Sequence, residues 1–232
     1  MDFTVKKYEE LLDTLIERNY NFQTFEEFLH NPKFKSIILR HDVDLLPHNS
    51  LRFAQIQAKK GVKGVYYFRA VPESWDKTVI KEIASLGHEI GYHYENLTTC
   101  KGNLERGIKD FEKNLTELRK LAKVSTICMH GSPMSKYDSK DLWRKYNYKD
   151  FNIIGEPYFD VDFSKVFYLT DTGRKWDGDK VSVRDKVKTD FTISFHKTDE
   201  IIASAKNGQF PDKIMFTFHP QRWSDNRLLW SK

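Results

Sequence analysis

The stretch SIILRHDVD, residues Ser36 to Asp44, decides the fold because an apolar run passes directly into charged residues. A strand buried in a parallel sheet is apolar along its length, since helices cover both of its faces. A predicted helix follows at residues 49–60 and is closed by Gly61. The stretch therefore predicts the first β-then-α unit of an α/β fold.

The same unit repeats along the chain. Strands are predicted at residues 64–69, 88–95 and 125–129, and helices at 76–86, 103–122 and near 140–146. The second half predicts strands at 151–155, 166–170, 181–183 and 213–218, and a helix at 198–206. Successive β-then-α units give a parallel sheet with right-handed crossovers, either open or closed into a barrel.

Residues 1–33 are predicted to form a short helical extension of a single domain that spans residues 1–232. Apolar residues at helical spacing mark the first helix between Val5 and Ile16, and Thr24 with Glu27 forms a capping box for the second. The chain ends in LLWSK, where a helix that packs on the last strand would begin. We therefore expect a truncated C-terminus.

The composition excludes several classes of protein. Hydrophobic residues make up 39% and charged residues 31%, as in an ordinary globular domain, and no apolar run reaches the ~18 residues of a membrane span. The net charge of +5 is spread along the chain without a basic block, which argues against a nucleic-acid partner. Two cysteines and the lack of an N-terminal signal sequence favour the cytoplasm. No sequence pattern indicates an oligomeric state.

Strongly polar residues follow the predicted strands. They are Arg40, Asp42 and Asp44 after the first, His93 and Glu95 at the end of the third, His130 after the fourth, and His219 after the last. In parallel α/β folds the C-terminal ends of the strands share one rim, where active sites lie. We therefore expect these side chains to meet in one candidate active site.

Asp42 and Asp44 are two residues apart, so an extended chain points both carboxylates to the same side, together with Arg40. Two carboxylates this close resist ionising together unless a cation lies between them or one of them stays protonated. Aspartate with imidazole ligands favours Zn²⁺ and also accepts Co²⁺, Mn²⁺ or Fe²⁺. A structural interpretation stays open, in which the aspartates cap the next helix and the histidines serve the core or turns.

At these residues the chain resembles the polysaccharide deacetylase superfamily, carbohydrate esterase family 4. The resemblance rests on LRHDVD at residues 39–44, GHEIGYH at 87–93 and FH at 218–219, and it covers residues 36–223. It implies a distorted (β/α)7 barrel that hydrolyses N-acetyl groups of sugars with a divalent metal. The prediction is thus a single-domain barrel of parallel strands with a short helical N-terminal extension.

The resemblance also implies roles for individual residues. Asp42 corresponds to the general base, Asp44 to the metal carboxylate, His93 to the first metal histidine and His219 to the general acid. The family's second metal histidine lies four residues after the first, where this chain has Leu97.

Two departures from the family pattern follow. We expect His130 to replace the missing ligand, with Glu95 as second candidate. The family's arginine motif is not recognisable, and Arg40 is expected to orient Asp42 in its place.

The sequence therefore predicts a metal-dependent hydrolase that removes an N-acetyl group from a sugar or glycan precursor. A cytoplasmic enzyme does not reach mature cell-wall polymer, which favours a small-molecule or precursor substrate. Three alternatives stay open: a metal-dependent amidase acting on a non-sugar amide, an inactive carbohydrate-binding relative, and a metal-independent amidase.

Overall fold

The structure is a computed structural model, and it describes residues 1–176 and 186–226. A seven-stranded sheet forms its centre, with the strand order β5-β4-β3-β2-β7-β6 and with β1 beside β2. All of these pairs are parallel. The strands are β1 (Asn21–Gln23), β2 (Ser36–Val43), β3 (Val65–Phe68), β4 (Glu89–Tyr94), β5 (Val124–Met129), β6 (Phe167–Thr170) and β7 (Lys213–Phe218).

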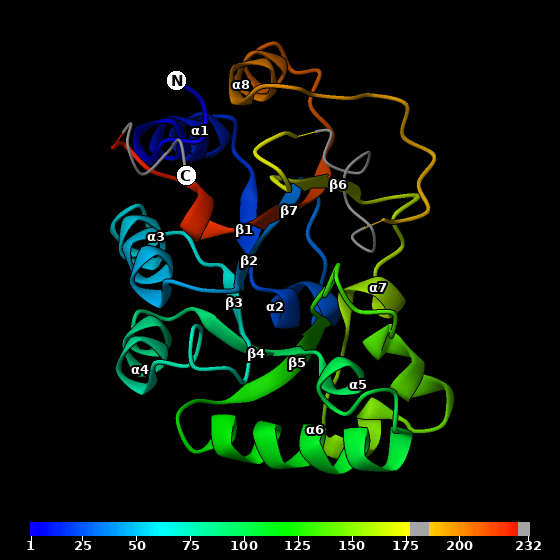
Figure 1. The fold of residues 1–232 in the computed structure, drawn as a ribbon. Coiled ribbons are helices and arrows are strands. Elements are labelled where there is room, and N and C mark those ends of the chain that lie inside the picture. Colours follow the sequence, from blue (N-terminus) through cyan, green and yellow to red (C-terminus); the bar gives the residue numbers. More distant parts are fainter. Residues whose placement is uncertain (177–185, 227–232) are drawn as a thin grey trace.

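Helices cover the outside of this sheet. Figure 1 shows α8, α1, α3, α4 and α6 following one another around the strands, with α7 on the opposite side. The α-helices are α1 (Val5–Glu17), α2 (Phe25–His30), α3 (Pro47–Lys59), α4 (Lys77–Ser85), α5 (Asn96–Thr99), α6 (Leu104–Arg119), α7 (Pro157–Asp160) and α8 (Thr198–Lys206). Short 3-10 helices are η1 (Ser139–Arg144), η2 (Tyr148–Phe151) and η4 (Pro220–Arg222). Within the described residues, no helix combines the length and apolar character that a membrane crossing requires.

The sheet is open, because its path ends at β5 and β6 and these strands do not pair in the described part of the chain. The strand predicted at residues 151–155 is wrong. Asn152 takes a left-handed φ of 56°, which ends η2 and breaks the extended chain, so only Gly155 bridges to Thr126 of β5. The strand predicted at 181–183 lies outside the described residues.

The N-terminal segment is more than a helical extension. Its two helices and the capping box of Thr24 with Glu27 are confirmed, but β1 lies between them and joins the sheet. β1 pairs with the first half of β2, at residues 36–38, while β3 pairs with residues 40–43. The segment therefore completes the sheet at the N-terminal end of the central strand.

Alternate residues of each strand face two different cores. On β2, Ile37 and Leu39 pack in the large core beneath the outer helices, whereas Ile38 packs in a smaller core on the other, inner face of the sheet. Phe25 of α2 joins that inner core. Strand alternation then places Arg40 and Asp42 on the inner face beyond Ile38, where the strand ends.

Gly91 shows how closely the inner face is packed. A Cβ atom at this position of β4 would lie 2.2 Å from the ring of Tyr67, on the neighbouring strand β3. Glycine is therefore required for the Tyr67 ring to fill the inner core. Tyr67 in turn contacts Thr126 on β5, with 3.1 Å between the two hydroxyl oxygens.

Candidate metal-dependent active site

The C-terminal strand ends bring the predicted site residues together. Nε2 of His93 lies 3.6 Å from Oδ2 of Asp42 and 3.6 Å from Oδ1 of Asp44. Nδ1 of His130 lies 3.2 Å from Oδ1 of Asp44. Nε2 of His219 lies 3.9 Å from Oδ2 of Asp42 and 3.8 Å from Oδ2 of Asp44. The five residues thus form one cluster, as the strand-end rule predicts.

Asp44, His93 and His130 form the donor set that best fits a metal ion. Oδ1 of Asp44 is buried and accepts no hydrogen bond within the described part of the chain, while Oδ2 accepts one from Gln221 at 3.3 Å. Nδ1 of His93 lies 2.9 Å from the Cys128 carbonyl oxygen. The Nδ1–H group therefore donates to that carbonyl, and the lone pair of Nε2 faces Asp44. A buried carboxylate oxygen beside two imidazole nitrogens suits Zn²⁺ or a similar divalent cation.

Burial sets the protonation state of His93. It lowers the pKa of the imidazole to about 4, against the opposing effect of Asp42. Burial alone would raise the pKa of Asp44, but His130 and His219 bring it below its ordinary value. At neutral pH the site therefore presents a neutral imidazole and an ionised carboxylate.

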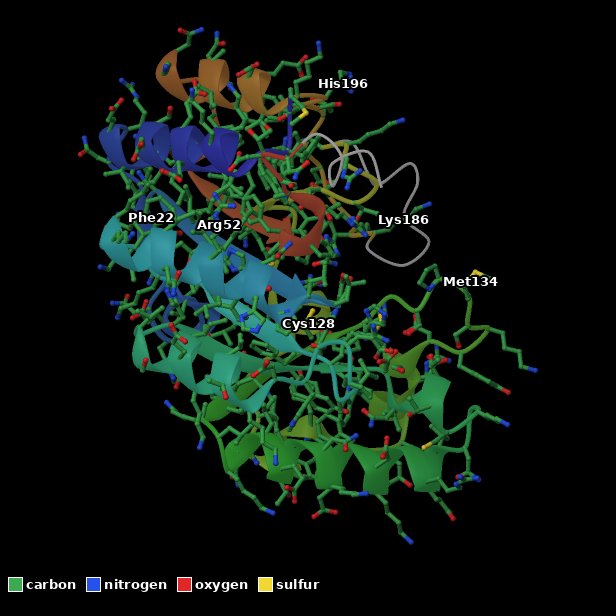
Figure 2. All side chains as sticks on the ribbon, turned by 60° about the vertical axis from the view of Figure 1, so that its left-hand side comes forward. Phe22, Arg52, Cys128, Met134, Lys186 and His196 are labelled. Atoms are coloured by element: carbon green, nitrogen blue, oxygen red, sulfur yellow. The ribbon has the colours of Figure 1, made fainter. Side chains whose placement is uncertain are left out.

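Asp42, His93 and Cys128 are also close enough to share an ion. Figure 2 shows Cys128 inside the molecule, and its side chain is fully buried. Both oxygens of Asp42, however, are held by Arg40, so an ion bound there would face a guanidinium group. The set around Asp44 lacks this repulsion and is the better candidate.

Leu97, at the family's second histidine position, lies away from this cluster. It is buried on α5, and its Cδ2 atom lies 3.2 Å from where a Cβ of Gly107 on α6 would stand. Glu95, the second candidate ligand, is held by Arg69 instead. The structure thus places His130, rather than Leu97 or Glu95, beside Asp44 and His93.

Arg40 holds Asp42 in a buried ion pair. Its Nε donates to Oδ1 at 2.8 Å and its Nη2 to Oδ2 at 2.6 Å. Burial would raise the pKa of Asp42, but Arg40, with smaller contributions from His93 and His219, brings the pKa below its ordinary value. Asp42 is therefore an ionised carboxylate of fixed orientation, in the arrangement expected from its spacing to Arg40.

His219 has a partner that the sequence did not indicate. Nδ1 of His219 lies 2.5 Å from Oδ1 of Asp171, and its backbone N–H donates to Oδ2 at 2.9 Å. Trp223 also donates to Oδ2, at 2.6 Å. Burial would lower the pKa of His219, but Asp171 raises it above its ordinary value. Asp171 directly follows β6, so the strand-end rule that selected the other residues also applies to it.

The rim is accessible beside His130. The His130 side chain is 15% exposed and that of Asp44 14% exposed. Met134, four residues beyond His130, is 99% exposed and lies at the outer edge of the molecule in Figure 2. The chain thus runs from the buried end of β5 to the surface within a few residues, and the His130 and Asp44 side chains stay partly exposed.

No protein-family model and no curated protein matches the chain. Solved structures similar to it are proteins of family CE4. One is a CE4 family pseudoenzyme from Bacillus anthracis, with 15% identity and a TM-score of 0.48 over 80% of this chain and 65% of that chain. Another is a mutant of the peptidoglycan deacetylase PdaC from Bacillus subtilis, with 12% identity and a TM-score of 0.45 over 80% of this chain and 89% of that chain.

A family 4 carbohydrate esterase from Bacillus anthracis is similar over a larger share of both chains. Its identity is 14% and its TM-score 0.44, over 92% of this chain and 93% of that chain. This chain spans about two thirds of the pseudoenzyme's length. At these identities the likeness concerns the fold alone.

Proposed function

We propose that the rim is the active site of a metal-dependent hydrolase that removes an N-acetyl group from a sugar or glycan precursor, in a divergent member of family CE4. One observation carries the proposal. Oδ1 of Asp44, which accepts no hydrogen bond from the residues that the structure describes, faces nitrogen atoms of His93 and His130. On the same rim stand an ion-paired carboxylate, Asp42, and a carboxylate-supported imidazole, His219.

Asp42 is the proposed general base. Arg40 binds both of its oxygens, so the carboxylate keeps its charge and direction while it takes the proton of the attacking water. A divalent cation held by Asp44, His93 and His130 would supply Lewis-acid stabilisation for the charge that develops on the amide oxygen.

His219 is the proposed general acid. Its Nδ1–H is fixed by Asp171, which leaves Nε2 directed toward Asp42 and Asp44. A proton on Nε2 passes to the leaving amine nitrogen, so that the amine departs neutral. Asp171 maintains the orientation of the ring and favours its protonated form.

One cavity comes near the site through Tyr158, although none of the five clustered site residues lines it. Its volume is about 770 Å³, and its wall includes Trp143, Tyr158 and Phe159 together with charged side chains such as Lys140 and Asp138. The Tyr158 hydroxyl lies 3.4 Å from both terminal nitrogens of Arg40, which joins the cavity to the base. Aromatic faces with hydrogen-bonding neighbours suit sugar rings, and the mixed charges do not select an ion of one sign.

An acetate-release assay over N-acetylated sugars, with glycan and nucleotide-linked forms, tests the proposal. We expect zinc- or cobalt-loaded protein to release acetate, chelator to stop the reaction, and added metal to restore it. Release from non-sugar amides alone would favour the amidase alternative. Metal-loaded protein that hydrolyses neither the N-acetylated sugars nor the non-sugar amides would favour an inactive relative. The presence of Leu97 at the family's second histidine position supports that alternative.

A further inference from the structure

A partly buried ion pair, Arg69 with Glu95, lies beside His130. Arg69 follows β3, and Glu95 follows β4. Nε of Arg69 donates to Oε1 of Glu95 at 2.8 Å, and Nη2 donates to Oε2 at 3.0 Å. The Glu95 side chain is 9% exposed and that of Arg69 20% exposed. Two parallel hydrogen bonds of this kind fix both side chains in the plane of the pair.

The pair connects the loops that carry the candidate ligands. Nη1 of Arg69 donates to the backbone oxygen of Asp44 at 3.2 Å. Ser132, two residues after His130, donates to Oε2 of Glu95 at 3.3 Å. Arg69 and Glu95 therefore link the ends of four neighbouring strands, β2 to β5.

Glu95 also stands behind the His130 ring. Nδ1 of His130 faces Asp44 at 3.2 Å, while its Nε2 lies 3.9 Å from Oε2 of Glu95. A metal-bound histidine usually donates its second ring N–H to a carboxylate or a backbone carbonyl, which fixes its tautomer and orientation. His93 has such an acceptor in the Cys128 carbonyl. The carboxylate that faces Nε2 of His130 is that of Glu95, just beyond direct hydrogen-bond distance.

We infer that Glu95, held by Arg69, is a positioning residue that directs Nδ1 of His130 toward the metal, and that it is not itself a ligand. The inference rests on the proposed function, because it assigns His130 to the metal site. It explains how the ring of His130, whose backbone N–H donates to the Tyr94 carbonyl at 2.9 Å, is aligned with Asp44 and His93.

Zinc affinity tests the inference. We expect Glu95→Gln and Arg69→Lys to weaken the zinc Kd about 10- to 100-fold, measured by competition with a chromophoric chelator, since loss of an outer hydrogen-bond partner has this effect in other zinc sites. Glu117→Gln, which removes an exposed carboxylate paired with Lys120, is the control and should leave the Kd unchanged. Unchanged affinity in Glu95→Gln would overturn the inference.

Two spectra separate positioning from ligation. Cobalt-loaded wild type and Glu95→Gln should show the same visible absorption per bound ion, because the ligand set is unchanged; a changed band would make Glu95 a ligand and contradict the inference. In zinc-loaded protein, ¹⁵N shifts should show Nε2 of His130 protonated and Nδ1 bound to the ion; a protonated Nδ1 would contradict the inference. A wild type that binds neither ion overturns the proposed function, whereas a metal-binding wild type with an unaffected Glu95→Gln variant overturns only this inference.

Discussion

The two ends of the inner sheet face each bury a carboxylate, and the pKa values of the two groups are shifted in opposite directions. Asp42 lies at the C-terminal end of β2 and is held by Arg40, which brings its pKa below the ordinary value despite burial. Glu89 lies at the N-terminal end of β4, where it accepts hydrogen bonds from the Thr126 hydroxyl and from the backbone N–H of Glu26 at 2.8 Å. Burial raises the pKa of Glu89 to about 7.

The difference lies in the partners, since both side chains are almost fully buried. A guanidinium group stabilises the charged form of Asp42, whereas neutral donors only partly offset the desolvation of Glu89. A charged, oriented carboxylate is suited to proton transfer, and a partly protonated one to capping α2. The burial of a carboxylate therefore does not by itself indicate function; the group that it pairs with must be considered as well.

The largest expected effect is on kcat and follows from removing the charge of the Asp42 carboxylate. Asp42→Asn should lower kcat by about 10³-fold or more, within the range that a general base supplies, with zinc content unchanged. It also leaves Arg40 without its charge partner, which should lower the free energy of unfolding by about 3 kcal/mol.

Measurements of kcat, of zinc content and of the free energy of unfolding in urea test this prediction. Ile83→Ala on α4 is a matched control, because emptying this fully buried site lowers stability by about 2–5 kcal/mol far from the rim. Full activity in Asp42→Asn, or equal loss in Ile83→Ala, would contradict the assignment of the base.

A second variant tests which strand end supplies the third ligand. His130→Ala should weaken zinc binding by more than about 100-fold, since loss of an outer partner alone costs 10- to 100-fold. Adding Leu97→His should not restore affinity, because residue 97 packs toward Gly107 on α6. Isothermal titration of both variants measures this, and recovery in the double variant would show that residue 97 reaches the metal.

Asp171→Asn tests the support of the general acid. General acid catalysis contributes a rate enhancement of ~10²–10⁴-fold. We expect Asp171→Asn to lower kcat by an amount near the lower end of this range, because His219 remains but loses its charged partner. Trp223→Phe is the matched control: it removes the indole N–H that donates to Oδ2 of Asp171 and keeps the contact between the His219 ring and Oδ1. Equal kcat losses in the two variants would indicate a purely structural role for Asp171.

At the other end of the sheet the expected effect concerns stability rather than activity. Because the pKa of Glu89 is about 7 in the folded protein and 4.5 ordinarily, the folded state binds more protons between these values. The free energy of unfolding should therefore decrease as the pH rises from about 4.5 to about 7, by roughly 3 kcal/mol for this residue.

Glu89→Gln should flatten this part of the stability profile in denaturant titrations at several pH values. Glu156, whose pKa burial also raises to about 7, is expected to retain its own contribution in that variant. A profile as steep as that of the wild type would show that Glu89 does not titrate in this window.

Much of the rim was predictable because one rule covers it. A polar residue after an apolar strand, with the two-residue periodicity of a strand, placed Arg40 and Asp42 on one face and His41 on the other. The same rule applies to Asp171 and Arg69, which follow β6 and β3. Neither residue belongs to the sequence motifs that match the family, so neither was selected.

The predictions failed where local conformation decides. Nothing in the apolar run FNIIG at residues 151–155 indicates the left-handed Asn152 that breaks the strand. β1 has three residues, so its signal is too short to separate it from the flanking helices. The direction of the Leu97 side chain depends on packing against α6, which no local pattern contains.

The position of a bound ion tests the account most directly. Crystals of zinc-loaded protein, measured at the zinc absorption edge, should give an anomalous peak bonded to Oδ1 of Asp44, Nε2 of His93 and Nδ1 of His130, with Asp42 still paired to Arg40. A peak among Asp42, His93 and Cys128, or no peak in protein saturated with zinc, would contradict it.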